Sequence, residues 1–372
     1  HNIMNKKFVV LIEDDFEVMG NGLGNVEDLQ YLPALSFMNI AQNYDAKITF
    51  MVDVAHQLQL KAHSKIPELE IQSNLWEKTI LMMKEKGHDV QLHLHPQWIN
   101  AKYKNGFFYL NENWNIGRCT NEEQSQLISE SIKYLESLIC PYYSNYSVIA
   151  FKAGSWGLQP SENLFHELEN NGISIVLGAR DNLKIDEQGL NYSGMEEKSM
   201  PYYPDYKDIT KISNTKSGVV MIPLQSYSPD LITLSKYIFS KIKNKLFKDK
   251  FHLKTYNAPD EIINLRPLKG TNSINFGFRP YQTHLKIGDT PFSYLKNSFD
   301  KVVKDLSKID SERIPIVIES HTKQFHNHYE DIENFIAYIN KEYSSIVEFG
   351  DLTSFQKEIA ENPNLAIYKN EN

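Results

Sequence analysis

Cysteine is scarce in this sequence, with Cys119 and Cys140 the only two among 372 residues. Two cysteines in a chain of this length do not make a disulfide framework, so the composition favours a reducing compartment. The sequence also lacks any run approaching the roughly 20 apolar residues that cross a bilayer. Its start, HNIMNKKFVVLIEDD, has no apolar region typical of a signal peptide. These absences predict a cytoplasmic protein.

Positive charge is not in excess either. Lysine and arginine number 39 against 47 aspartates and glutamates, which gives a net charge of −8. General nucleic-acid binders carry a basic face, so we expect no nucleic-acid partner. What the chain does have is ordinary globular composition, with 41% hydrophobic residues and 12% aromatic residues. That is ample material for a large core.

Strand and helix patterns alternate along most of the chain. Repeated strand–helix units of this kind predict a parallel sheet, either open or closed into a barrel. Ser73 is expected to cap one helix, and Thr120 or Asn121 to cap the next. The stretch between roughly 180 and 310 breaks the alternation and is expected to be an insertion. The expected strands are 7–15, 46–54, 89–95, 147–154, 173–179, 313–321 and 346–352, and the expected helices are 35–44, 73–87, 121–139, 160–172 and 329–343.

Two histidines stand one residue apart in GHDVQLHLHPQW. The segment VQLHLH alternates as a strand does, and alternate side chains of a strand point to the same face. His93 and His95 would therefore project together, close enough to share one metal ion. The alternative is a pair of hydrogen-bonded histidines at a strand end.

Other reactive side chains also fall where expected strands end. The first strand ends in Glu13, Asp14 and Asp15, the fourth in Lys152, and a late strand in His321. Active sites of parallel α/β folds form at the carboxyl ends of the strands. Together with the histidine pair, these residues predict a metal site at one rim of the sheet.

The order of these motifs resembles the polysaccharide deacetylases of carbohydrate esterase family four. LIEDDFE is similar to that family's Asp-Asp pair after the first strand, KITFMV to its second strand, and GHDVQLHLHP to its GHEIGNH motif. FKAG is similar to its FR-x-P strand, and IVIESH ends a late strand in histidine as the family does. The resemblance covers most of residues 7–180 and 313–352. The H-x-H spacing, Phe16 in place of glycine and Lys152 in place of arginine depart from the family pattern.

The resemblance implies a fold and a domain extent. We expect an α/β fold, a distorted (β/α)7-type barrel with a large insertion before the last strands. A single domain would span 5–360, with the insertion at about 180–310.

It also implies a metal site. Asp15, His93 and His95 would bind one divalent ion, most consistent with Zn²⁺, whose catalytic sites use three protein ligands and leave a position open. A second cluster of His321 with His326 and His328 is an alternative, against solvated loop histidines.

The resemblance assigns catalytic roles as well. Asp14 would be the general base, His321 the general acid, and Lys152 the cation that keeps Asp14 ionised. Strand alternation leaves open a rival pairing, with Glu13 and Asp15 on one face. Capping of the turn after the first strand is the alternative for the aspartate pair.

The expected activity is hydrolytic removal of acetyl groups from an N- or O-acetylated sugar or polysaccharide. Trp98 and Trp156 follow the motifs and would suit a sugar platform, although both could equally be core residues. Two other functions remain open. One is a glycoside hydrolase using Asp14 or Glu13 with Glu319, and the other is a non-catalytic glycan-binding pseudoenzyme.

The segment 236–254, KYIFSKIKNKLFKDKFHLK, holds seven lysines and one acid with apolar residues between them. Such a run is usually a solvated helix face. The sharper interpretation is peripheral contact with an anionic membrane or a glycan-lipid.

Overall fold

The fold is built around one parallel sheet. The computed structural model describes residues 6–216, 218–246, 256–265 and 282–369. Eight strands follow one another in the order β12-β7-β6-β3-β2-β1-β14-β13, and β15 pairs with β1. Every pairing in this sheet is parallel. The strands are β1 (Phe8–Phe16), β2 (Ile48–Asp53), β3 (Asp89–Leu94), β6 (Ala150–Ala153), β7 (Ile175–Leu177), β12 (Val220–Met221), β13 (Lys286–Ile287), β14 (Ile314–Ser320) and β15 (Val347–Phe349).

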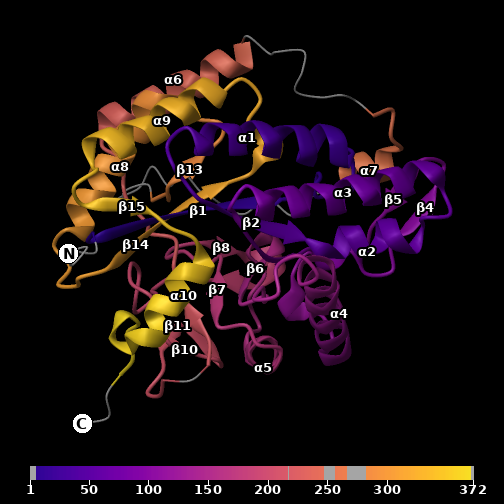
Figure 1. The fold of residues 1–372 in the computed structure, drawn as a ribbon, viewed down its shortest axis with the longest axis horizontal. Helices are drawn as coiled ribbons and strands as arrows, with labels where there is room; N and C mark the ends of the chain where they lie inside the picture. The colour runs from indigo at the N-terminus through magenta and orange to yellow at the C-terminus, as the bar shows by residue number, and fades with distance from the viewer. Residues whose placement is uncertain (1–5, 217, 247–255, 266–281, 370–372) are drawn as a thin grey trace.

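Helices surround the curled sheet (Figure 1). Three small antiparallel hairpins lie outside it: β4 (Lys102–Lys104) with β5 (Phe107–Tyr109), β8 (Lys184–Ile185) with β9 (Leu190–Asn191), and β10 (Pro204–Asp205) with β11 (Asp208–Ile212). Among the described residues, no helix is both long and apolar enough to cross a membrane. The helices are α1 (Leu32–Gln42), α2 (Val54–Ala62), α3 (Pro67–Glu85), α4 (Asn121–Ile139), α5 (Glu162–Asn170), α6 (Leu231–Leu246), α7 (Asp260–Asn264), α8 (Phe292–Leu306), α9 (Tyr329–Glu342) and α10 (Leu352–Glu361).

The two faces of β1 enter different parts of the core. Alternate side chains of a strand point to opposite faces. Phe8, Val10 and Ile12 pack into the large cluster between the sheet and the helices. Val9 and Leu11 belong to a smaller cluster on the inner, concave side of the sheet. The residues that continue this inner series are Glu13 and Asp15, so charged groups follow the apolar ones at the carboxyl end of the strand.

The expected α/β barrel is confirmed at the level of architecture. Its strands form an open path, because no pairing joins β12 to β13 within the described residues. The stretch expected as an insertion supplies β12, β13 and α8 as well as the hairpins β8–β9 and β10–β11. The domain extent of 5–360 and the insertion at about 180–310 stay predictions.

Candidate active site

Three acids extend from the inner face of β1. Glu13 and Asp15 lie within the strand, and Glu17 follows one residue after its end. All three are at least 95% buried. They face the carboxyl ends of the adjacent strands β3 and β6 and of β14, which lies on the other side of β1, and these ends bring histidine and lysine side chains to the same place. The expected gathering of charged groups at the strand ends is therefore observed.

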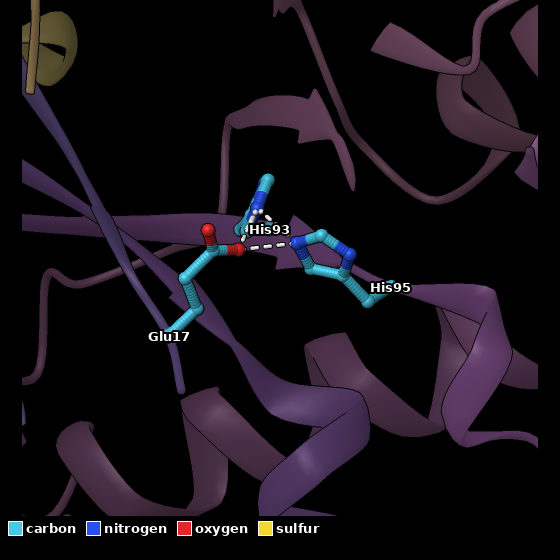
Figure 2. Close-up of side chains that lie close together, drawn as sticks. All are labelled: Glu17, His93 and His95. Carbon is cyan, nitrogen blue, oxygen red and sulfur yellow. Dashed lines mark hydrogen bonds and ion pairs between the residues drawn. The ribbon is translucent and has the colours of Figure 1, made fainter. Parts of the chain in front are cut away.

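His93 and His95 do point the same way, and their partner is Glu17 (Figure 2). The two Nε2 atoms lie 3.0 Å apart, and Glu17 Oε2 lies 3.0 Å from His93 Nε2. The same carboxylate oxygen also contacts His95 Nε2. Glu17 is not among the site residues predicted from the sequence.

The geometry of these three residues fits a divalent metal ion. Metal–ligand bonds of about 2.0–2.2 Å in a tetrahedron imply ligand atoms roughly 3.3 Å apart, close to the 3.0 Å that separates His93 Nε2 from both His95 Nε2 and Glu17 Oε2. His93 Nδ1 donates to the carbonyl oxygen of Lys152 at 2.8 Å, which leaves Nε2 directed at the cluster. Glu17, His93 and His95 form one possible ligand group, and Asp15, Glu17 and His321 form another.

Lys152 contacts three acids of the site. Its Nζ lies 2.7 Å from Glu13 Oε1, 2.9 Å from Asp15 Oδ1 and 3.7 Å from Glu319 Oε2. Burial alone would raise the pKa of Asp15, but the charges of Lys152, His93 and His321 outweigh it and hold that pKa well below its usual range. Burial dominates at Glu13, whose pKa is raised well above the ordinary value despite Lys152. Lys152 therefore keeps Asp15 ionised.

His321 lies at the mouth of the cluster. Its Nε2 is 3.0 Å from Asp15 Oδ2, and its Nδ1 is 3.5 Å from Glu319 Oε1. The side chain of His321 is 16% exposed, whereas that of Asp15 is 6% exposed. Glu319 also accepts a hydrogen bond from His284 Nε2 at 3.1 Å. His321 thus lies against two carboxylates and is the residue among these that solvent reaches most easily.

Lys323 is a second buried cation that the sequence analysis missed. Its Nζ donates to Glu17 Oε1 at 2.6 Å and to the carbonyl oxygen of Val18 at 3.0 Å. Burial opposes ionisation of Glu17, but Lys323 and His95 hold its pKa well below the usual range. One carboxylate oxygen of Glu17 is therefore held by a lysine while the other faces the histidines.

Asp14 lies outside this cluster. It is on the opposite face of β1, where Oδ1 accepts hydrogen bonds from Ser320 Oγ at 2.7 Å and from the backbone N–H of Thr322 at 2.9 Å. The expected interaction of Lys152 with Asp14 is wrong, because Lys152 contacts the acids of the inner face. Strand alternation is the reason, and the rival pairing of Glu13 with Asp15 is the one observed.

The histidines are positioned by close neighbours. A Cβ added at Gly154 would lie 2.6 Å from His95 Nδ1, so the glycine leaves room for the imidazole ring. The backbone N–H of His95 donates to Asp53 Oδ1 at 3.4 Å. Gly154 comes directly after β6, and Asp53 is the last residue of β2. Both neighbouring strands of β3 thus contribute to the placement of His95.

The two tryptophans differ. Trp98 is 2% exposed and packs against His56 and Phe108, with ring centroids 4.6 and 5.2 Å away. It is a core residue, so the prediction that it forms a sugar platform is wrong. Trp156 is partly exposed and its ring meets His284 edge-on at 5.5 Å. Its substrate-binding role stays a prediction.

The loop histidines after His321 do not form a second metal cluster with it in the described part of the chain. Neither possible ligand group there includes His326 or His328. His328 Nδ1 instead contacts Asp331 Oδ2 at 2.9 Å near the start of α9.

Comparison with known proteins rests on three-dimensional structure. No family model and no curated protein matches the sequence. A protein from Mycobacterium smegmatis described as a polysaccharide deacetylase matches with a TM-score of 0.51 and 11% identity, over 99% of this chain and 94% of its own. The chain has the polysaccharide deacetylase fold.

Two further structures resemble this chain. PuuE allantoinase matches with a TM-score of 0.49 and 11% identity over 96% of this chain and 91% of its own. A protein of Pseudomonas aeruginosa PAO1 described as a polysaccharide deacetylase has a TM-score of 0.48 and 11% identity over 96% and 92% of the two chains. At 11% identity, the match to the Mycobacterium smegmatis protein shows the fold alone, so the chemistry must be argued from the residues.

Proposed function

We propose that this protein is a metal-dependent hydrolase that removes acetyl groups from an N- or O-acetylated sugar or polysaccharide. The observation that carries the proposal is the convergence of Glu17, His93 and His95 beside an ionised, lysine-held Asp15. The polysaccharide deacetylase fold supports the choice of substrate class.

Glu17, His93 and His95 would hold the metal. Two imidazoles and one carboxylate are a donor set that suits catalytic zinc. A bound ion would supply Lewis acidity, polarising the acetyl carbonyl and making water more acidic. The predicted ligand set of Asp15 with the two histidines is less well supported, because Asp15 lies 3.9 Å from His93 Nε2 and is held by Lys152.

Asp15 is the proposed general base in place of Asp14. It is ionised, it projects to the inner face, and it is two residues from Glu17 on the same side of the chain. Lys152 would keep its carboxylate charged and oriented while it accepts a proton from the attacking water. Lys152 supplies charge without the bidentate hydrogen bonding of an arginine. Its contact with Glu13 fixes its position.

His321 is the proposed general acid. Cleavage of an amide needs a proton on the departing nitrogen, and a positioned imidazole can deliver one near neutral pH. Its place at the mouth of the cluster, beside Asp15 and Glu319, suits transfer of a proton to a group that then leaves.

The glycoside hydrolase alternative fits less well. Such enzymes need two carboxyl groups flanking the sugar bond. Here Glu13 and Glu319 both lie within 4 Å of Lys152 Nζ, so neither is directed at open space. A non-catalytic glycan-binding protein would share the same residues, and turnover separates it from the hydrolase.

The test combines metal analysis with acetate release. Purified protein loaded with Zn²⁺ is given N-acetylated chitooligosaccharides and acetylated xylan, and the variants Glu17→Gln and Asp15→Asn are compared with Glu130→Gln, an exposed control. We expect Glu17→Gln to lose metal. Asp15→Asn should keep metal and lose roughly 10²–10⁴-fold in turnover.

Two results would overturn the proposal. One is a metal-loaded protein that releases no acetate from any acetylated sugar. The other is metal loss in Asp15→Asn with full retention in Glu17→Gln, which would reverse the two assigned roles.

A further inference from the structure

Helix α6 carries an unusual concentration of exposed apolar side chains. Ten large hydrophobic residues are exposed in the described part of the chain, and five of them lie on this helix. Scattered exposed apolar residues are normal, whereas a contiguous group marks an interaction surface. The five residues, here called the α6 stripe, are Leu231 (84% exposed), Ile232 (69%), Ile238 (49%), Phe239 (71%) and Ile242 (50%).

The stripe occupies the outer side of the helix. Leu231, Ile238 and Ile242 are spaced by seven and four residues, which places them on one face. The other side of α6 packs inward, where the ring of Tyr237 lies 5.2 Å from that of Tyr294 in α8. Figure 1 shows α6 at the outside of the layer that it forms with α8 and α9. The stripe therefore faces away from the fold.

The charged side chains within α6 are all lysines, and Asp230, which accepts a hydrogen bond from the backbone N–H of Thr233, is the acid just before the helix. Lys236 and Lys243 are exposed, and each lies about one turn from Phe239, which places both along one border of the stripe. Lys241 lies on the inward side and pairs with Asp289. From 231 to 246 the sequence contains no acid. The lysine-rich segment continues through 254, but residues 247–254 lie outside the described part of the chain.

We propose that α6 lies in the interface of an anionic lipid bilayer. The stripe would enter the boundary between headgroups and acyl chains, and the bordering lysines would contact anionic headgroups, the arrangement typical of interfacial amphipathic helices. A second copy of the chain is disfavoured as the occupant. A two-fold contact through this stripe would bring the same lysines of both copies together with no acid on the helix to balance them.

The test is co-sedimentation of the full chain with phosphatidylcholine vesicles, with and without phosphatidylglycerol. Binding should require phosphatidylglycerol and fall at least about tenfold at high salt, because exposed charges are then screened. Ile238→Ser with Phe239→Ser should abolish binding, and Lys236→Glu with Lys243→Glu should weaken it at least tenfold. Ile71→Ser with Lys133→Glu changes one exposed apolar residue and one exposed lysine elsewhere and should leave binding unchanged.

Equal binding to neutral and anionic vesicles, absence of binding, or binding that survives both α6 double variants would overturn the proposal. A wild-type dimer in analytical ultracentrifugation that becomes monomeric in Ile238→Ser with Phe239→Ser, with no vesicle binding, would assign the stripe to a second copy. Acetate release from soluble substrate should be unchanged in every α6 variant, so the outcome is independent of the proposed activity.

Discussion

Asp14 and Asp15 are neighbours in β1, yet their surroundings drive their pKa values in opposite directions. Burial raises the pKa of Asp14 to about 7, although hydrogen bonds from Ser320 and Thr322 counteract part of the effect. Asp15 is just as deeply placed, but Lys152 and two histidines hold its pKa low. A one-residue change of position thus decides whether a carboxylate is a structural or a chemical group.

The raised pKa of Asp14 predicts a pH dependence of stability. Between about pH 4 and 7 the folded state holds a proton on Asp14 that the unfolded state has lost, so this group's contribution falls as pH rises. The slope for one such group is about 1.4 kcal/mol per pH unit. In Asp14→Asn that component is absent.

Urea unfolding at a series of pH values measures the effect. The free energy of unfolding of Asp14→Asn relative to wild type should increase from about pH 4.5 to 6.5 and level off above about pH 7. Asp310→Asn, at an exposed position, is the matched control for loss of one carboxylate. A difference between Asp14→Asn and wild type that does not vary with pH would contradict the assignment.

His321→Ala should slow acetate release from acetylated sugar by roughly 10²–10⁴-fold, because the leaving group loses its proton donor. The loss should be smaller on 4-nitrophenyl acetate, whose leaving group needs no proton. Metal content, measured by elemental analysis, should not change. Metal loss would instead make His321 a ligand, in the group that it forms with Asp15 and Glu17.

The candidate site could be predicted in part from sequence because its members lie at the carboxyl ends of strands in one parallel sheet. His93, His95, Lys152 and His321 were found in this way. Glu17 is not predicted from the sequence motifs because it lies one residue beyond β1, two residues after the aspartate pair. Every second residue of a strand points to the same face, so counting on from Glu13 gives Asp15 and then Glu17.

Among the structural elements, the turn after β6 places Gly154 directly against the ring of His95. Gly154→Ala should push the imidazole of His95 away from Glu17, since the added Cβ would lie within 2.7 Å of three ring atoms. We expect metal affinity to fall roughly 10–100-fold, as for other changes beside metal ligands. Titration with a chromophoric chelator measures it.

Gly106→Ala is the comparison variant, because a Cβ there meets nothing within 4 Å and the residue lies in the β4–β5 turn. Its positive φ makes it a test of backbone strain without a change at the site. Unchanged metal affinity in Gly154→Ala, with folding confirmed by circular dichroism, would show that His95 does not need its present ring position.

Helix ends were predictable where local chemistry fixes them. Thr120 and Glu123 form a capping box, and α4 covers the expected residues 121–139. Ser73 was expected to begin a helix, but α3 starts at Pro67. Ser73 is buried inside it, where its Oγ accepts a hydrogen bond from Gln57. Helix α2 was missed because its apolar start continues the run of β2.

At the scale of the whole molecule, bound metal should raise the thermal stability of the protein. An ion that binds only the folded state at 100 times its dissociation constant adds about 2.7 kcal/mol. With an unfolding entropy of about 2.1 cal/mol/K per residue, the midpoint of thermal unfolding should rise by about 3 °C. Differential scanning calorimetry with Zn²⁺ and then with a chelator checks this, and Glu17→Gln should show no rise.

The pairing of β1 with β14 has a consequence for synthesis on the ribosome. Phe8 pairs with Ile314, so about 300 residues must be translated after β1 before its partner exists. At roughly 5–20 residues per second that takes about 15–60 s. During this interval residues 8–11 of the apolar run FVVLI lack their sheet partners, because β2 pairs with β1 only from Ile12 onward and β15 is translated even later than β14. These residues are open to association with other nascent chains. The acids that follow it place negative charge beside the run, as gatekeeper residues do. Glu13, Asp15 and Glu17 would thus protect the nascent strand before they serve the folded site.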